Sequence, residues 1–220
     1  MGAVEVSGLR GLYAVTPDWA DSARLLAVTR AILDGGCRLV QYRNKTANAA
    51  LRVAQARALR ALTRMYGARL IVNDDPDLAL AVGADGVHLG AQDGDLASAR
   101  ALLGPAAVLG ASCYQSLPQA RTAVAAGANY VAFGAVFPSP TKPQAGRATP
   151  ALLAEAVRSL PVPVAAIGGI TLANVQDVIA TGVRLVAVIS ALYDAPDPAW
   201  AAARFTASFA NGKEMHDLSQ

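Results

Sequence analysis

The feature that most constrains the fold is an alternation of short apolar runs with segments of helical periodicity, from Gly11 almost to the end of the chain. The apolar runs are rich in Val, Leu and Ile, which is typical of buried β-strands, whereas the intervening segments carry apolar residues at helical spacing. Eight strands are predicted, at 12–15, 39–42, 70–73, 86–89, 108–112, 130–134, 164–167 and 185–189. Helices are predicted at 22–33, 48–65, 117–126, 174–180 and 198–210, among others.

A short internal repeat supports this alternation. A glycine stands just before four of the predicted strands, at Gly36, Gly83, Gly127 and Gly182. Each glycine lies where a helix is expected to end, and glycine is the usual residue for the left-handed conformation found there. Four copies of one helix-to-strand junction indicate a repeated βα unit.

Eight such units without a break in composition predict an α/β protein with a single (β/α)₈ TIM barrel over residues 1–210, followed by a polar C-terminal tail at 211–220. A doubly wound open sheet is the alternative. That fold usually has a glycine-rich turn after its first strand. Thr16-Pro17-Asp18 stands at this place, so the barrel is favoured.

The charge and cysteine content narrow the partners and the compartment. The net charge of +3 comes without a long run of like charges, which favours phosphorylated small molecules over nucleic acid as partners. No apolar run approaches the roughly 18 residues of a membrane span. Two cysteines, Cys37 and Cys113, are too few for a disulfide framework. We expect a soluble, cytoplasmic protein; the oligomeric state stays open, and a homo-oligomer is compatible with the sequence.

Polar or small residues follow seven consecutive predicted strands at their carboxyl ends, where (β/α)₈ barrels carry their active sites. They are Gln41, Arg43 and Lys45; Asn73 and Asp74; His88 and Asp93; Ser112; Ser139, Thr141 and Lys142; Gly168 and Gly169; and Ser190. Alternate side chains of an extended chain share a face, so Gln41, Arg43 and Lys45 are expected to project together. The whole set is expected at one mouth of the barrel.

Two anion sites are predicted from this set. Arg43, Lys45 and Lys142 have the charge to hold a diphosphate, and Asp74 with Asp93 would bind Mg²⁺ beside it. Glycine backbone at 168–169, with the hydroxyls of Ser139, Thr141 and Ser190, suits a monophosphate. This asymmetry suggests one substrate with a diphosphate leaving group and one with a phosphate tag.

Some of these residues have a structural explanation. Asp75 before Pro76 is an ordinary helix cap, and Asp93 ahead of Gly94 is equally a turn residue. A histidine at the position of His88 is more often a hydrogen-bonded core residue than a catalyst. Cys113 is expected to face away from the mouth if Ser112 faces into it.

Taken in order, the motifs resemble those of the thiamine-phosphate synthase family, from Gly11 to about Phe205. They are QYRNK at 41–45, VNDD at 72–75, DGVHLG at 85–90 with Asp93, GAS at 110–112, FPSPTK at 137–142, AIGGIT at 166–171 and VISAL at 188–192. The resemblance implies a (β/α)₈ barrel that joins 4-amino-2-methyl-5-(diphosphooxymethyl)pyrimidine to a thiazole phosphate. The family releases diphosphate and uses Mg²⁺.

The resemblance also implies roles for individual residues. Gln41 would contact the pyrimidine and Ser112 the pyrimidine diphosphate, while Arg43, Lys45, Asn73 and Lys142 would hold the diphosphate. Asp74 and Asp93 would bind Mg²⁺, and Ser139, Thr141, Gly169, Ile189 and Ser190 would hold the thiazole phosphate. Arg43, Lys45 and Lys142 are the expected catalytic residues, because they stabilise the leaving group.

Three positions depart from the commonest family pattern. Asn44 stands where an acidic residue is usual, Ala91 where a glutamine is common, and Tyr114 where histidine is frequent. None removes an assigned diphosphate or metal ligand, but Tyr114 argues against a histidine-based proton transfer there. Asn44 has no predicted role, and Tyr42 is expected to pack towards the helices.

Two other functions remain open on this scaffold. A thiazole tautomerase would bind the thiazole phosphate but would need no diphosphate site, and the full set of cations and carboxylates argues against it. A non-catalytic barrel that binds a phosphorylated ligand would have no use for a metal pair beside a diphosphate site.

Overall fold

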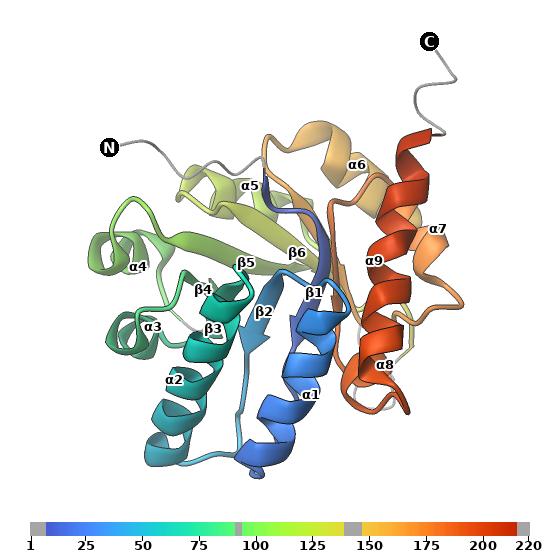
Figure 1. The fold of residues 1–220 in the computed structure, drawn as a ribbon. Coiled ribbons are helices and arrows are strands. Elements are labelled where there is room, and N and C mark those ends of the chain that lie inside the picture. The colour runs from blue at the N-terminus through green and yellow to red at the C-terminus, as the bar shows by residue number, and fades with distance from the viewer. Residues whose placement is uncertain (1–7, 91–93, 139–146, 215–220) are drawn as a thin grey trace.

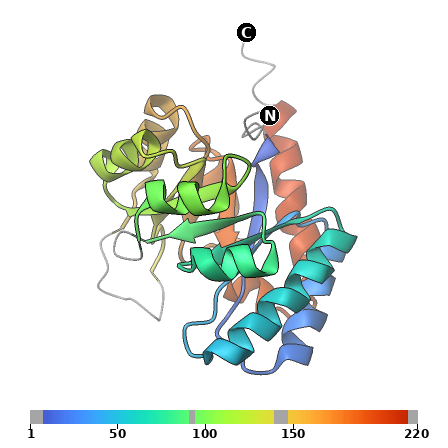
Figure 2. The ribbon, with the colours of Figure 1, turned by 90° about the vertical axis from the view of Figure 1, so that its left-hand side faces the viewer.

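The computed structural model describes residues 8–90, 94–138 and 147–214. Within these ranges eight strands form a closed barrel in chain order, and every neighbouring pair is parallel. Figures 1 and 2 show helices around the outside of the strands. The strands are β1 (Gly11–Val15), β2 (Leu39–Tyr42), β3 (Arg69–Asn73), β4 (Gly86–Leu89), β5 (Val108–Tyr114), β6 (Tyr130–Gly134), β7 (Val164–Ile167) and β8 (Leu185–Val188). The predicted (β/α)₈ barrel is confirmed.

The helices follow the strands in the predicted alternation. They are α1 (Ser22–Asp34), α2 (Ala49–Met65), α3 (Pro76–Val82), α4 (Leu96–Leu103), α5 (Leu117–Ala125), α6 (Pro150–Ser159), α7 (Val175–Ile179), α8 (Ser190–Tyr193) and α9 (Pro198–Glu214). In the described ranges no helix is long and apolar enough to cross a bilayer. α9 packs against α1 and closes the ring of helices.

The C-terminal helix differs from its predicted extent. α9 continues to Glu214, so the boundary between barrel and tail predicted at residue 210 falls inside a helix. Once a helix is formed, each further residue adds a hydrogen bond without a new nucleation cost, which lets a polar end extend it. The short α8 was not predicted, because one turn leaves no periodic pattern in the sequence.

Local signals explain the junctions. Gly36, Gly83, Gly127 and Gly182 all have positive φ, as predicted for residues that end a helix before the next strand. At the start of α3, Asp75 Oδ1 accepts a hydrogen bond of 2.8 Å from the backbone N–H of Leu78. The predicted capping role of Asp75 is therefore confirmed.

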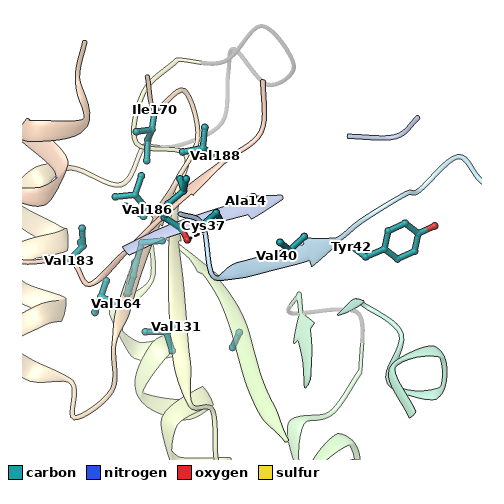
Figure 3. Close-up of a cluster of buried hydrophobic side chains, with 14 of the residues drawn as sticks. Ala14, Cys37, Val40, Tyr42, Val131, Val164, Ile170, Val183, Val186 and Val188 are labelled. Carbon is teal, nitrogen blue, oxygen red and sulfur yellow. Dashed lines mark hydrogen bonds between the residues drawn. The ribbon is translucent and has the colours of Figure 1, made fainter. Parts of the chain in front are cut away.

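Buried side chains form two layers that follow the strand alternation. The barrel interior contains Tyr13, Val15, Leu39, Ile71, Val108, Tyr130, Ala132, Ala165, Leu185 and Ala187, with Leu9 at the same cluster. The layer between strands and helices includes Ala14, Val40, Tyr42 and Cys113, part of which Figure 3 shows. Tyr42 and Cys113 thus face the helices, as predicted. Beyond these two apolar layers, the interior-facing residues at the carboxyl ends of the strands line the mouth of the barrel, where the candidate functional site is expected.

Candidate functional site

A polar cleft of about 320 Å³ lies at the carboxyl ends of β2 and β3. Its lining is formed by Tyr42, Asn44, Lys45, Ala47, Arg52, Val72, Asn73, Asp74 and Asp75. Two short segments, the end of each strand and the loop after it, supply all but one of these residues; Arg52 comes from α2. Lys45, Asn73 and Asp74 of this lining belong to the set for which the sequence predicted an anion and a cation, and that role stays a prediction.

Lys45, Asn73 and Asp74 meet in this cleft. Asp74 Oδ2 lies 3.1 Å from Lys45 Nζ and accepts a hydrogen bond of 2.6 Å from Asn73 Nδ2. The backbone of Asp74 has φ +60°, a left-handed conformation that costs energy for a residue with a Cβ. A hydrogen bond of 2.8 Å from the Asp74 backbone N–H to the His88 carbonyl oxygen holds it there. Backbone strain at such a position is typical of functional sites.

Arg43 is held on the other side of β2. Its guanidinium donates to both carboxylate oxygens of Asp18, at 3.0 and 2.9 Å, and the backbone N–H of Lys45 donates to Asp18 Oδ1 at 2.7 Å. The sequence did not point to Asp18. The expected common projection of Gln41, Arg43 and Lys45 differs from the structure, because β2 ends at Tyr42 and strand alternation stops there. Asp18 and Asp74 hold the two cations on either side of the strand.

Asn44 organises the loop that carries these cations. Its Nδ2 donates to the Trp19 carbonyl oxygen at 2.9 Å and to Gln55 Oε1 at 3.1 Å. Its Oδ1 accepts from the backbone N–H groups of Thr46 and Ala47. The side chain is buried, and its hydrogen bonds connect the loop to α2 and to the segment after β1. Asn44 therefore has a structural role that the sequence did not reveal.

Asp74 offers an oxygen ligand to a divalent cation. Within residues 8–90, 94–138 and 147–214, Lys45 and Asn73 both contact Asp74 through Oδ2, so Oδ1 is the oxygen that these two contacts leave for a metal. In the described part of the chain, no three His, Cys, Asp or Glu side chains gather into a metal site. Mg²⁺ is typically held by one or two carboxylates together with water and substrate phosphates. A single carboxylate at Asp74, beside Lys45 and Asn73, fits that kind of site.

A second group of polar side chains crosses the interior of the barrel. Gln41 Nε2 donates to the Tyr13 hydroxyl at 2.7 Å, and that hydroxyl lies 2.7 Å from the hydroxyl of Tyr130. Tyr130 contacts His88 Nδ1 at 2.9 Å, and His88 Nε2 contacts Ser112 Oγ at 2.8 Å. Five strands thus contribute one side chain each to a continuous chain of hydrogen bonds.

Burial dominates the electrostatics of this chain. Desolvation lowers the pKa of His88 to about 4, although the nearby Asp74 carboxylate acts in the opposite direction. Desolvation likewise raises the pKa of both Tyr13 and Tyr130 above its ordinary value. The imidazole and both phenols are therefore uncharged near neutral pH. His88 is a hydrogen-bonded core histidine, as the sequence favoured.

The sequence predicted the other anion site at the ends of β7 and β8. Gly169 is exposed with φ +66°, and its carbonyl oxygen accepts a hydrogen bond of 3.0 Å from Asn174 Nδ2. Ile189 packs on the interior cluster, and Ser190 is exposed at the start of α8. A cavity of about 460 Å³ lies beside Ser190 and continues to Leu172 and Trp200. These strands lie on the opposite side of β1 from the polar cleft.

The structure brings together some predicted residues and leaves others undescribed. Gln41, Asn73 and Asp74 lie at the ends of the adjacent strands β2 and β3. Ser112 lies on β5, where it faces inward while Cys113 faces out. Asp93, Ser139, Thr141 and Lys142 lie outside the described residues, as does Ala91. Tyr114 is 47 % exposed with φ +52°, next to a register shift in β5.

Sequence reasoning missed Tyr13, Tyr130 and Asp18. The two tyrosines were counted as ordinary strand residues, although both stand at inward-facing positions of their strands. A buried tyrosine hydroxyl requires a hydrogen-bond partner, and that requirement was the available signal.

Known proteins of one description resemble this chain over most of its length. The family model described as thiamine monophosphate synthase matches residues 12–192. Thiamine-phosphate synthase of Thiobacillus denitrificans is 56% identical over 91% of this chain and 95% of its own length. The enzyme of the same description from Aromatoleum aromaticum is 54% identical over 91% of this chain and 97% of its own length.

Solved structures also superpose on this chain. Thiamine phosphate pyrophosphorylase from Pyrococcus furiosus superposes with a TM-score of 0.84 and 36% identity, covering 94% of this chain and 98% of that one. A 3-hexulose-6-phosphate synthase superposes with a TM-score of 0.66 at 20% identity, covering 90% of this chain and 99% of that one. The second likeness shows the barrel fold alone.

Proposed function

This chain belongs to the thiamine monophosphate synthase family, and from that premise we propose that it joins 4-amino-2-methyl-5-(diphosphooxymethyl)pyrimidine to thiazole phosphate. The products are thiamine phosphate and diphosphate, so the enzyme is a transferase. The observation that carries the proposal is the cluster of Lys45, Asn73 and Asp74 in a polar cleft at the strand ends. A cation and a carboxylate side by side suit a diphosphate that arrives with a metal ion.

The diphosphate site is proposed at β2 and β3. Lys45 Nζ would exchange its ion pair with Asp74 for one with the diphosphate, and Asn73 Nδ2 would supply a neutral donor. Arg43, which is paired with Asp18 on the other side of β2, would turn from that carboxylate to the diphosphate. Lys142, outside the described residues, completes the proposed set of cations.

Mg²⁺ is part of the proposal, with Asp74 as its ligand from the described chain and Asp93 as the second. When bound, Mg²⁺ supplies positive charge that stabilises the departing diphosphate. Lys45 pairs with Asp74 Oδ2 in the structure, and both side chains are partly exposed, so this ion pair can open when the metal and the diphosphate bind.

The reaction proposed for this site is dissociative. The bond between the pyrimidine methylene carbon and the diphosphate oxygen breaks, and the oxygen keeps the electron pair. The thiazole nitrogen then donates its lone pair to the pyrimidine-methyl cation and becomes the thiazolium nitrogen. Lys45, Arg43 and Lys142 stabilise the leaving group, and positioning of the two substrates supplies much of the rate. No protein nucleophile takes part.

The thiazole phosphate is proposed to bind at β7 and β8. Gly169, Ile189 and Ser190 would contact the phosphate through backbone N–H groups and one hydroxyl, with Ser139 and Thr141 from the loop after β6. This site would bind the phosphate without a metal. The diphosphate site, by contrast, would combine Mg²⁺ with several cationic side chains, so the two sites would differ in positive charge.

The assay that tests the proposal is incubation with both substrates, followed by detection of thiamine phosphate and diphosphate. We expect both products in equal amounts, and removal of Mg²⁺ by a chelator should abolish turnover. Lys45→Met and Lys142→Ala should lower kcat far more than they raise the KM for thiazole phosphate. Arg121→Met, an exposed cation on α5, is the matched control and should retain wild-type rates.

Two results would contradict the proposal. Exchange of thiazole tautomers without any need for the pyrimidine diphosphate would assign the chain to the isomerase alternative. Binding of thiazole phosphate with no product from either substrate would assign it to a non-catalytic phosphate-binding barrel.

A further inference from the structure

The hydrogen-bond chain inside the barrel begins and ends at the mouth. It runs from Gln41 on β2 through Tyr13, Tyr130 and His88 on β1, β6 and β4 to Ser112 on β5, with donor–acceptor distances from 2.7 to 2.9 Å. Gln41 and Ser112 have proposed substrate contacts. The three residues between them have no role in the proposed reaction.

The direction of the chain follows from counting protons. Gln41 donates its Nε2–H to the Tyr13 hydroxyl, so the single Tyr13 proton is free to donate to Tyr130. The Tyr130 proton then goes to His88 Nδ1, which must be an unprotonated acceptor. A neutral imidazole with a bare Nδ1 carries its proton on Nε2, and this N–H donates to Ser112 Oγ.

Burial fixes this arrangement. Tyr13 is 1 % exposed, Tyr130 0 % and His88 7 %, so a group left without a partner would carry the full cost of desolvation. The ring of His88 stacks on Tyr130 with centroids 5.5 Å apart, and Tyr130 meets Tyr13 edge to face at 5.8 Å.

Gly110 makes room for this stacking. A Cβ on Gly110 would lie 2.3 Å from the Tyr130 hydroxyl oxygen and 2.5 Å from His88 Nδ1. The absence of a side chain at Gly110 therefore allows Tyr130 and His88 to approach each other. The contact between Tyr130 and His88 therefore depends on this glycine.

We propose that Tyr13, Tyr130 and His88 are positioning residues that set the orientation of the Gln41 amide and thereby select a 4-aminopyrimidine. With one Nε2–H used by Tyr13, Gln41 presents Oε1 as an acceptor and its second Nε2–H as a donor. A 4-amino group and the adjacent ring nitrogen offer the complementary donor and acceptor, as adenine does to Gln or Asn. This inference rests on the proposed function and deepens it.

The other end of the chain acquires a defined role as well. Because Ser112 Oγ accepts from His88, its own proton is available to the substrate. That proton suits an anionic oxygen of the diphosphate. If the chain ran in the opposite direction, the Ser112 proton would be used by His88, and Gln41 would present its NH₂ group where an acceptor is needed.

The 4-oxo analogue of the pyrimidine diphosphate tests the direction. Its carbonyl oxygen and ring N–H reverse the donor and acceptor of the 4-amino compound, so a fixed Gln41 should reject it. Tyr130→Phe removes the acceptor of the Tyr13 proton, which can then turn to Gln41 and flip the amide. We expect the ratio of the dissociation constants of the two compounds, measured by calorimetry without thiazole phosphate, to shift by about tenfold or more towards the 4-oxo analogue.

Tyr193→Phe is the matched control. Its hydroxyl is also buried and lies 3.1 Å from Thr29 Oγ1, outside the barrel interior. The control should lose a buried hydrogen bond but keep the wild-type ratio. If Tyr130→Phe keeps the wild-type ratio and the wild type still forms thiamine phosphate, the inference is overturned and the proposed function stands. If the wild type forms no thiamine phosphate, the proposed function itself is overturned.

The tautomer of His88 is a second readout, and it is measured on the wild-type protein without substrate. The chain contains two histidines, so ¹⁵N NMR of the imidazoles is readily assigned with the variant His88→Asn. We expect His88 to carry its proton on Nε2 and to have a bare Nδ1. A proton on Nδ1 would overturn the direction of the chain.

Discussion

The side chain of Asn44 fixes the loop that presents Lys45 to Asp74. Both protons of its Nδ2 are used, by Trp19 O and Gln55 Oε1. Gln55 in turn donates to Trp19 O and Ser22 Oγ and accepts from the Tyr42 hydroxyl, so the buried network is fully paired. A buried amide in such a network specifies one loop conformation, because each alternative would leave a polar group without a partner.

Replacing this amide by a carboxylate should destabilise the fold. Asn44→Asp places a carboxylate against two acceptors that it cannot donate to, and we expect a loss of about 1–3 kcal/mol in the free energy of unfolding. Asn48→Asp is the control, since Asn48 caps α2 by accepting a hydrogen bond from Leu51 N–H and Asp caps equally well. Denaturant unfolding of both variants measures the difference. Equal stability of the two would contradict the role of Asn44.

His88 should make stability depend on pH below neutrality. Burial lowers the pKa of His88 from its ordinary value of 6.5 to about 4 in the folded protein. Between these two pH values the unfolded chain therefore binds a proton at His88 that the folded chain does not bind. Stability from the neutral imidazole is fully present above pH 6.5 and is lost as pH falls towards 4. Between pH 7 and pH 5, wild type should lose about 2 kcal/mol more than His88→Asn. Because His216 is present in both proteins, parallel losses would refute the assignment.

At the scale of elements, the strands were predictable because they are buried apolar runs, and four of them follow a helix that ends at a glycine with positive φ. The gathering of polar residues at one mouth of the barrel was predictable as well, since parallel strands bring their carboxyl ends together. The side-chain directions after Tyr42 were not, because a strand's alternation ends with the strand. The partners of Tyr13 and Tyr130 were also hidden, since their contact depends on the barrel register and joins residues 117 positions apart.

The glycine loop after β7 allows an element-scale prediction. A Cβ at Gly169 would lie 2.8 Å from both Phe137 Cβ and Pro138 O, so Gly169→Ala must displace the loop after β6. Gly67→Ala is the control, because Gly67 has φ +59° but open space around a Cβ. Both variants should lose about 1–2 kcal/mol through the left-handed backbone.

Only Gly169→Ala should raise the KM for thiazole phosphate in addition. Steady-state kinetics with the thiazole phosphate varied will measure this effect. A KM equal to that of Gly67→Ala would contradict the proposed place of the phosphate at β7 and β8.

At the scale of the molecule, the closed barrel would hold the two proposed anion sites in surroundings of different charge. The polar cleft at β2 and β3 contains Lys45 and Asp74, whereas the ends of β7 and β8 offer mainly backbone and a hydroxyl. β1 lies between them, and its Tyr13 connects Gln41 to the interior chain. In the proposed reaction, this arrangement would let the pyrimidine substrate lose its diphosphate while the thiazole substrate keeps its phosphate.

The most direct test of this arrangement is a crystal structure grown with inorganic diphosphate and Mn²⁺, which prefers the same oxygen ligands as Mg²⁺. We predict an anomalous peak within coordination distance of the Asp74 carboxylate, with the diphosphate bound between that metal and Lys45. A diphosphate bound beside Gly169 and Ser190, with no metal at Asp74, would contradict the account.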